Sequence, residues 1–249
     1  MDLKAYEYIT KNNLVNDHWW FRGREKIVKS ALSNYLSYKK DNLILDIGSG
    51  LGQFFPILKE FGKVFGVERN KTFADISIER YPFATIYNDS YPSNKIDIKK
   101  FNIICMFDFL EHLEVPDIFL KELSGALKSN SLVIISVPAY MFLWSDIDEI
   151  SEHYHRFNSK EINKLFSDNN YECVYKTYFM TLLFPLVLIS RKIIQPLIRN
   201  KKFLFDFESS KKGLINSICF KIFQFESFFI RKKIALPFGL SILGIFKKK

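Results

Sequence analysis

The chain is poor in cysteine and lacks an apolar run long enough to cross a membrane. Its three cysteines, Cys105, Cys173 and Cys219, lie far apart and form no Cys-x-x-Cys pair. This argues against a disulfide framework or a zinc ribbon and is typical of a reducing cytosol. The uncharged run 178–190 has 13 residues, whereas a spanning helix needs about 20. Residues 1–7 are polar and include acids, so no secretory signal is expected.

Acidic residues are scarce in the last third of the chain. Residues 178–249 hold 14 Lys and Arg against 3 Asp and Glu, while residues 1–177 hold 22 against 24, so the whole net charge of +9 comes from the C-terminal part. That part also contains 12 of the 26 Phe. Three interpretations fit a basic, Phe-rich segment: contact with a membrane surface or a lipid-linked substrate, an ordinary helical cover or dimer contact, and nucleic-acid binding. Nucleic acid is disfavoured because Leu, Ile and Phe dominate the runs.

Between residues 41 and 177, short apolar runs alternate with stretches of helical periodicity. Strands are expected over 42–47, 63–67, 84–87, 101–106, 132–137 and 171–177, and helices over 53–61, 71–81, 115–127 and 159–167. This alternation predicts an α/β protein with a mostly parallel sheet and helices on both faces. We expect one domain over 1–249, built from an N-terminal helical cap (1–40), a cofactor-binding core (41–177), a basic, Phe-rich helical insertion (178–235), and a last strand at 236–246 within a basic tail (236–249).

A glycine-rich loop follows the first expected strand. Gly48, Gly50 and Gly52 form a G-x-G-x-G pattern, and Gln53 stands where a dinucleotide fingerprint needs a third glycine. Such a loop lets backbone N–H groups approach a ligand at the carboxyl end of the sheet. Glu68 ends the second strand, where a carboxylate can accept hydrogen bonds from both hydroxyls of a ribose. Together these features predict an adenosine-containing ligand, and they suit NAD and S-adenosylmethionine alike.

Several segments in order resemble the class I S-adenosylmethionine-dependent methyltransferases. The loop Asp46–Gly52 with Glu68 is similar to motif I of that family and the acidic residue that follows it, and 101–113 is similar to its fourth strand with an Asp-x-x-Glu-His-Leu turn. A subgroup of the family also shares the segments 18–24 (HWWFRGR), 136–140, 153–157 and 236–241 (LPFGLS). Residues 178–235 match only in hydrophobic character.

The resemblance implies a Rossmann-like methyltransferase fold, a doubly wound seven-stranded sheet in the strand order 3-2-1-4-5-7-6, and S-adenosylmethionine as cofactor. The residues expected to bind this cofactor are Asp46, Gly48, Ser49, Gly50, Gly52, Glu68, Arg69, Asp89, Ser90, Phe107 and Asp108. Asn-Asp-Ser at 88–90 is also an ordinary turn sequence, so a local role for Asp89 stays open. Trp19, Trp20 and Phe21 form either a lid over the cofactor or packing that anchors the first helix to the sheet.

Two kinds of chemistry fit the polar residues after strands four and five. Asp108, Glu111 and His112 have spacings that would place them on one face of a helical turn, and His153 could complete a site for Mg²⁺, Mn²⁺ or Zn²⁺. Metal-dependent O-methyltransferases show a similar set, but with Glu in place of Asp108. The alternative is that Glu111 and His112 hold a helix start while Asp108 lines the cofactor pocket. Without a metal, His153 or His155 is the expected general base, and Asp108 is the third catalytic candidate.

The sequence as a whole predicts a methyltransferase that acts on an oxygen atom of a small-molecule, lipidic, lipid-linked or glycan-type acceptor. It would be cytoplasmic, with 178–235 as a possible contact to the inner face of the membrane. The alternatives are a non-catalytic methyltransferase-like binding module at a membrane surface and an RNA 2′-O-methyltransferase. An NAD-dependent oxidoreductase is disfavoured by Gln53.

Overall fold

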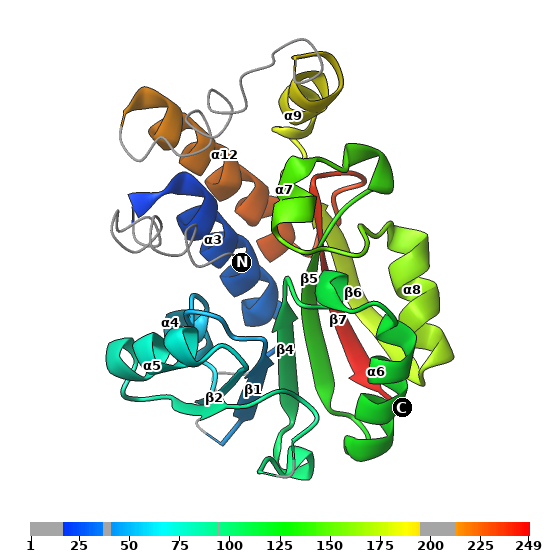
Figure 1. Cartoon of the computed structure of the whole chain (residues 1–249). Coiled ribbons are helices and arrows are strands. Elements are labelled where there is room, and N and C mark those ends of the chain that lie inside the picture. The colour runs from blue at the N-terminus through cyan, green and yellow to red at the C-terminus, as the bar shows by residue number, and fades with distance from the viewer. Residues whose placement is uncertain (1–16, 37–40, 94, 195–212) are drawn as a thin grey trace. The chain divides into compact units, whose positions relative to one another are not determined.

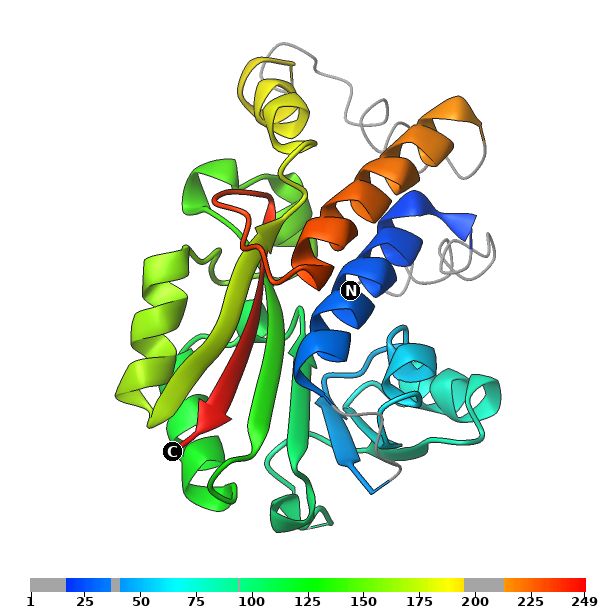
Figure 2. The same cartoon turned by 180° about the vertical axis from the view of Figure 1, so that it is seen from behind.

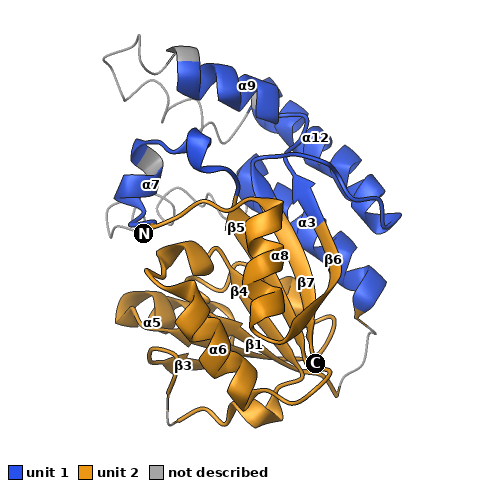
Figure 3. Cartoon of the chain, turned by 90° about the vertical axis from the view of Figure 1, so that its right-hand side faces the viewer, with its two compact units in different colours: residues 1–35, 139–153, 177–241 blue, residues 36–138, 154–176, 242–249 orange. Residues whose placement is uncertain are grey.

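The computed structural model describes residues 17–36, 41–93, 95–194 and 213–249. The chain divides into two compact units (Figure 3): unit 1 comprises 1–35, 139–153 and 177–241, and unit 2 comprises 36–138, 154–176 and 242–249. The expectations for 1–16, 37–40 and 195–212 lie outside the described residues. The predicted single domain with its four segments stays a prediction.

A seven-stranded sheet, which belongs to unit 2 apart from residues 177–179 and 241, has the order β3-β2-β1-β4-β5-β7-β6. Its strands are β1 (Leu43–Ile47), β2 (Lys63–Glu68), β3 (Thr85–Asn88), β4 (Ile103–Phe107), β5 (Leu132–Pro138), β6 (Tyr171–Phe179) and β7 (Ser241–Lys248). β1 pairs in parallel with β2 and β4, β2 with β3, and β4 with β5. The carboxyl ends of these five strands therefore meet at one edge, where open α/β sheets bind ligands. The predicted strand order and fold class are confirmed.

The helices of unit 2 follow the strands, as the sequence alternation predicts. They are α4 (Phe55–Leu58), α5 (Lys71–Arg80), α6 (Pro116–Ala126) and α8 (Ser159–Asp168), with the 3-10 turns η1 (Ile98–Lys100) and η2 (Leu110–His112). Figure 1 shows α4 and α5 beside β1 and β2, and α6 and α8 beside the other half of the sheet. Side chains define the helix starts: Asn158 and Glu161 form a capping box at α8, and Pro116 opens α6.

Two predicted elements are wrong in their bounds. The helix expected over 53–61 is reduced to α4, because the N–H groups of Ile57, Glu60 and Phe61 each donate to a carbonyl three residues earlier, which makes tight turns instead of an α-helix. The strand expected over 236–246 begins only at Ser241. A Cβ at Gly239 would lie 2.2 Å from the carbonyl oxygen of Phe179, so the chain passes this backbone too closely for a side chain.

Unit 1 contains two long helices, α3 (Trp19–Tyr35) and α12 (Leu214–Arg231), that lie side by side (Figures 1 and 2). The remaining helical elements of its described part are η3 (Met141–Leu143), α7 (Asp146–Ile150), α9 (Phe184–Ile189) and η4, a π-helical turn (Ser190–Ile194). Helices α3 and α12 run parallel to each other. The Trp19 N–H donates to Asn216 Oδ1 (2.7 Å) at their first turns, and Asn34 Nδ2 donates to the Ile230 carbonyl (2.9 Å) at their last turns.

The packing of α3 on α12 depends on a glycine and an aromatic pair. A Cβ at Gly23 would lie 2.4 Å from the ring of Phe223, so this ring rests on the backbone of α3. The ring of Trp19 lies 5.8 Å from the Phe223 ring, centroid to centroid. These contacts pack Trp19 against α12, and both the lid and the anchor on the sheet stay predictions. None of the described helices has the length and apolar character that crossing a bilayer requires.

Glu25 on α3 makes the stability of unit 1 depend on pH. Burial raises the pKa of its carboxyl to about 7, against the opposing charges of Arg22 and Lys26. A pKa that is higher in the folded than in the unfolded chain adds stability at low pH, and this stability is lost as the pH rises from 4.5 through about 7. We expect Glu25→Gln to unfold at the wild-type temperature at pH 4.5 and above it at about pH 8. Thermal unfolding followed by circular dichroism across this range tests it; a difference that does not change with pH would contradict it.

Candidate functional site

The glycine loop after β1 makes its turn through three left-handed glycines. Gly48, Gly50 and Gly52 have φ of +73°, +53° and +69°, a region that other residues rarely adopt. The N–H groups of Gly48 and Ser49 donate to the Val67 carbonyl at 2.9 and 3.0 Å, which ties the loop to the end of β2. The G-x-G-x-G pattern therefore reflects a real conformational need at each position.

Gly50 differs from its two neighbours in what surrounds it. A Cβ at Gly48 would lie 2.5 Å from the ring of Phe109, and one at Gly52 would lie 2.7 Å from the ring of Phe55. A Cβ at Gly50 would have no heavy atom within 4 Å. The glycines at 48 and 52 are thus required by packing inside the protein, whereas Gly50 presents its backbone to open space that a ligand can occupy.

Glu68 lies directly beside this open position. Its Oε2 accepts from the Gly50 N–H at 2.9 Å, and its Oε1 accepts from the Asn70 N–H at 2.7 Å. The side chain is 8% exposed. Each carboxylate oxygen has two lone pairs, so these bonds orient Glu68 and still leave acceptor capacity for hydroxyl groups of a ligand. Glu68 thus contacts the glycine loop directly, and its role as a cofactor ligand stays a prediction.

The polar atoms behind the loop fit a bound adenosine-type cofactor. Within the part of the chain that the structure describes, Asp46 Oδ1 and Ser49 Oγ are buried and have no hydrogen-bond partner, a costly state that a ligand can relieve. Burial, with a smaller effect from the Glu68 charge, raises the pKa of Asp46 well above its usual value. Because orphaned acceptors, an open backbone and an oriented carboxylate meet at one strand end, the residues present fit the predicted cofactor.

Phe107 and Asp108 end β4 next to β1. The ring of Phe107 packs against the Phe54 ring, with centroids 4.2 Å apart. Asp108 has a left-handed φ of +53°, and its Oδ1 accepts from Ser136 Oγ at 3.0 Å. The helical turn η2 begins only at Leu110, so Asp108 is not part of it, contrary to the expected single face with Glu111 and His112. The left-handed residue ends the strand and changes the chain direction.

The other cofactor candidates lie after β2 and β3. Asp89 Oδ1 accepts from the Ser90 N–H (2.9 Å), and its Oδ2 accepts from Ser93 Oγ (2.7 Å) and lies 3.3 Å from Lys95 Nζ. Its pKa is lowered, chiefly by the Ser93 hydrogen bond. This local turn gives Asp89 a structural role, and its cofactor role stays a prediction. Ser90 and Arg69 are exposed.

Glu111 and His112 occupy η2, after β4. Glu111 is buried, and its carbonyl accepts from the Tyr154 N–H at 2.7 Å, which fixes the loop after β5 to this turn. Asp108, Glu111 and His112 belong to unit 2, whereas His153 belongs to unit 1. The four-residue metal set therefore stays a prediction.

His153 is held by an aspartate that the sequence interpretation did not select. Its Nδ1 lies 2.9 Å from Oδ1 of Asp148, and its backbone N–H donates to the Asp148 carbonyl at 2.9 Å. Asp148 is 0% exposed. A buried carboxylate on Nδ1 sets the ring orientation and selects the tautomer in which Nε2 is the basic nitrogen. The sequence does not single out Asp148, because its spacing of five residues from His153 matches no regular helix face.

The carboxylate of Asp148 also contacts the residue just before α7 and a cation from another segment of unit 1. Its Oδ2 accepts from the Ser145 N–H at 2.9 Å and lies 3.9 Å from Arg191 Nη1. Arg191 also donates to the Leu143 carbonyl. Arg191 comes from the segment predicted as an insertion, so this basic segment contributes a cation beside the His153–Asp148 pair.

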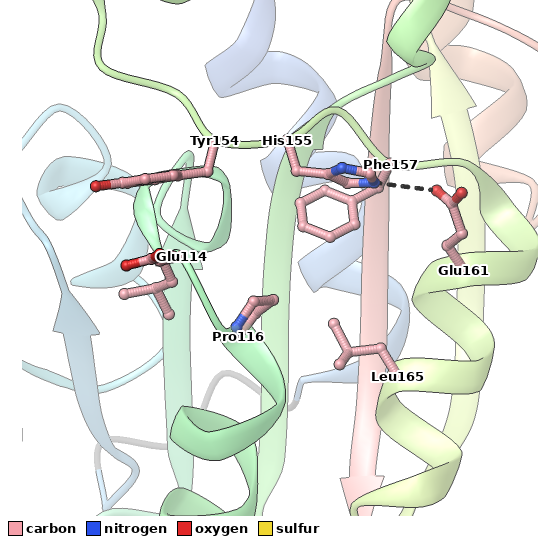
Figure 4. A pocket seen from close by; sticks show the side chains of 8 residues that line it. Glu114, Pro116, Tyr154, His155, Phe157, Glu161 and Leu165 are labelled. Atoms are coloured by element: carbon pink, nitrogen blue, oxygen red, sulfur yellow. Dashed lines mark ion pairs between the residues drawn. The ribbon is translucent and has the colours of Figure 1, made fainter.

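His155 lies in a groove of unit 2 with a volume of about 320 Å³. Figure 4 shows its ring and the Glu161 carboxylate pointing toward one another, with His155 Nε2 and Glu161 Oε2 3.5 Å apart. The His155 ring also packs at 4.8 Å on that of Phe157. The residues that line the groove are Leu113, Glu114, Pro116, Tyr154, His155, Phe157, Glu161 and Leu165. His155 is half-exposed on its groove wall, whereas His153 is oriented by a buried carboxylate.

Comparison with protein families and curated proteins identifies related sequences. A family model described as a methyltransferase domain matches residues 20–176. A ubiquinone biosynthesis O-methyltransferase of Pelagibacter ubique (strain HTCC1062) is 25% identical over 150 residues, which cover 51% of this chain and 62% of the relative. The match thus spans less than two thirds of the relative's own length.

Solved structures share the fold. A phosphoethanolamine N-methyltransferase 2 of Haemonchus contortus in complex with S-adenosyl-L-methionine has a TM-score of 0.60 at 18% identity, covering 98% of this chain and 56% of that one. A geranyl diphosphate C-methyltransferase of Streptomyces coelicolor A3(2), in complex with Mg²⁺, geranyl-S-thiolodiphosphate and S-adenosyl-L-homocysteine, has a TM-score of 0.58 at 14% identity, covering 89% and 75%. At these identities the likeness concerns the fold alone.

Proposed function

The chain belongs to the class I S-adenosylmethionine-dependent methyltransferases, and we propose that it methylates an oxygen atom of a lipidic, lipid-linked or glycan-type acceptor. The observation that carries the proposal is the His153–Asp148 pair, because a hydroxyl acceptor needs a base and an imidazole oriented by a buried carboxylate supplies one. The relative named as a ubiquinone biosynthesis O-methyltransferase supports oxygen as the acceptor atom.

The glycine loop and Glu68 would hold the cofactor. Gly50 offers an open backbone position beside Glu68, and the two Glu68 oxygens are oriented by backbone N–H groups. In this arrangement Glu68 binds the ribose hydroxyls, and Asp46 and Ser49 offer polar atoms deeper in the loop. The chemistry that bound S-adenosylmethionine supplies is a methyl group on a positively charged sulfur.

The work left to the protein is to align the acceptor and remove its proton. His153 Nδ1 is engaged by Asp148, so Nε2 is the atom that accepts the proton of the acceptor hydroxyl. The resulting imidazolium is stabilised by the Asp148 carboxylate on the opposite side of the ring. On its other oxygen, Asp148 accepts from the Ser145 N–H and lies 3.9 Å from Arg191 Nη1. His155 is the alternative base, with Glu161 in the corresponding position.

The acceptor class rests on the segment between β6 and β7. This segment combines Phe, Leu and Ile with Lys and Arg, a composition suited to an acceptor that is partly apolar and lies at or near an anionic surface. We therefore place the enzyme at the inner face of a membrane as a peripheral protein. The competing proposal is a methyltransferase-like module that binds the cofactor and a membrane without turnover.

Transfer of labelled methyl groups distinguishes the methyltransferase from the non-catalytic binding module. Purified protein would be mixed with methyl-labelled S-adenosylmethionine and lipid or glycan extracts from cells that lack the gene. We expect label in one extracted species that gains the mass of one methyl group, and no label with Gly50→Arg. If the protein binds the cofactor but labels no extract, the binding module is the better proposal. Label that appears only in added RNA would favour the 2′-O-methyltransferase alternative.

A further inference from the structure

Helix α12 carries apolar residues on two opposite faces. One stripe, spaced by three and four residues, is buried: Asn216, Cys219, Phe223, Glu226 and Ile230. Phe223 within it packs on α3. A second stripe with the same spacing lies on the opposite face: Leu214, Ile218, Lys221, Phe225, Phe228 and Lys232. Because an apolar stripe on a helix normally faces a packing partner, a second apolar stripe opposite the buried one indicates a further contact surface.

The apolar side chains of the second stripe are exposed to solvent. Leu214, Ile218, Phe225 and Phe228 are between 46% and 75% exposed, and they follow one another along the whole helix. Scattered exposed apolar residues are ordinary on protein surfaces, but a contiguous row of them marks a contact surface. The rings of Phe225 and Phe228 are also held in place, since each lies within 5.8 Å of the Phe229 ring, centroid to centroid.

The charges on this face are all positive. Lys221 and Lys232 lie in the stripe, and Arg231 and Lys233 end the helix beside it. Glu226 is the one acid in the sequence of α12, and it is 2% exposed. Its carboxylate accepts hydrogen bonds from the backbone N–H groups of Met180 (2.6 Å) and Leu182 (2.8 Å). The Glu226 side chain therefore points into the protein and not toward the outer face. Among the described residues of α12, the outer face therefore combines aromatic and aliphatic side chains with cations, and the one carboxylate lies on the other face.

We propose that this outer stripe of α12 docks on an anionic lipid surface. Phe, Ile and Leu side chains enter the boundary between headgroups and acyl chains, while Lys221 and Lys232 extend their alkyl stems and leave their ammonium groups at the phosphates. The inference rests on the proposed membrane location and deepens it by naming the helix face that makes the contact. Lipid binding itself needs neither cofactor nor turnover. It gives a lipid-borne acceptor a route to the enzyme.

Charge argues against the other occupants of this face. In a symmetric dimer through α12, the cationic rims of two copies would face one another, which is unfavourable. Nucleic acid would use the cations and could stack bases on the Phe rings, but Leu214 and Ile218 have no flat face to offer. An anionic membrane satisfies both the apolar row and the cations.

Vesicle flotation with the full chain tests the proposal. Extruded vesicles of phosphatidylcholine with about one third phosphatidylglycerol are compared with pure phosphatidylcholine, without cofactor. We expect binding to the anionic vesicles that weakens as salt rises. Ile218→Ser with Phe225→Ser is expected to lower the partition coefficient at least about tenfold, because two exposed apolar side chains no longer enter the lipid.

A matched control removes the same residue types elsewhere. Ile78 and Phe83 in unit 2 are 48% and 39% exposed, and Ile78→Ser with Phe83→Ser is expected to bind vesicles as the wild type does. Calorimetry with S-adenosylmethionine on all three proteins checks that folding and the cofactor site are intact. Equal vesicle binding by the α12 variant and the wild type overturns the proposal, as does absence of wild-type binding. Light scattering that shows a dimer lost in the α12 variant, without lipid binding, assigns the face to self-association.

Discussion

Gly50→Arg is expected to weaken the binding of S-adenosylmethionine by more than about 100-fold, because the new side chain takes the cofactor's place and its guanidinium pairs with Glu68. The expectation follows from two observations. No heavy atom lies within 4 Å of a Cβ at Gly50, so the arginine would project into open space. The Gly50 N–H already donates to Glu68 Oε2, so this space adjoins the carboxylate that we assign to the ribose. Isothermal titration calorimetry gives the Kd directly.

Gly125→Arg is the matched control for this experiment. A Cβ at Gly125 also meets no heavy atom within 4 Å, but this glycine lies on α6 and has no positive φ. We expect its Kd to equal that of the wild type. Thermal unfolding separates a blocked site from a lost fold, since φ of +53° at Gly50 strains any other residue by about 1–2 kcal/mol. Equal affinity for the two arginine variants would remove the glycine loop from the cofactor site.

His153→Asn is expected to lower kcat for methyl transfer by about 10²- to 10⁴-fold, the usual contribution of a general base. The Kd of S-adenosylmethionine should stay unchanged, since the proposed cofactor residues Asp46, Ser49, Gly50 and Glu68 lie on β1, the glycine loop and β2. Asp148→Asn should lower kcat with little effect on KM, because it removes the carboxylate that orients the ring and stabilises the imidazolium. The measurement is the initial rate of label transfer to the species found in the extracts.

Two control variants test whether His153 or His155 is the general base. Asp146→Asn changes the same residue type on α7 and is expected to keep kcat within about threefold, the range of surface substitutions. His155→Asn tests the other base. If His155→Asn loses activity and His153→Asn keeps it, the base assignment moves to the groove with Glu161. If both variants keep their activity, the reaction does not depend on either histidine, and transfer to an oxygen acceptor loses its main support.

A comparison of predicted and observed element bounds shows which bounds local sequence patterns can predict. β1, β2 and α8 begin and end close to the predicted residues because hydrophobic alternation and a capping box are local. The last strand begins five residues later than its apolar run, because residues 236–240 lie against the backbone of 177–179. An apolar run cannot report such a contact, since it depends on a segment distant in sequence.

The sequence by itself determined the glycine loop, the acid at the end of the second strand and the strand order that the family resemblance implied. The glycines and the acid follow from local requirements, a left-handed φ at each glycine and a carboxylate at the strand end. The strand order came from the resemblance alone. Only the tertiary structure decided that Asp148 holds His153, that Arg191 joins them, and that one face of α12 is covered while the other is not. The physical reason is that these three features depend on which distant segments come into contact. The sequence pattern around an apolar or charged residue is the same whether or not the fold supplies a partner for it.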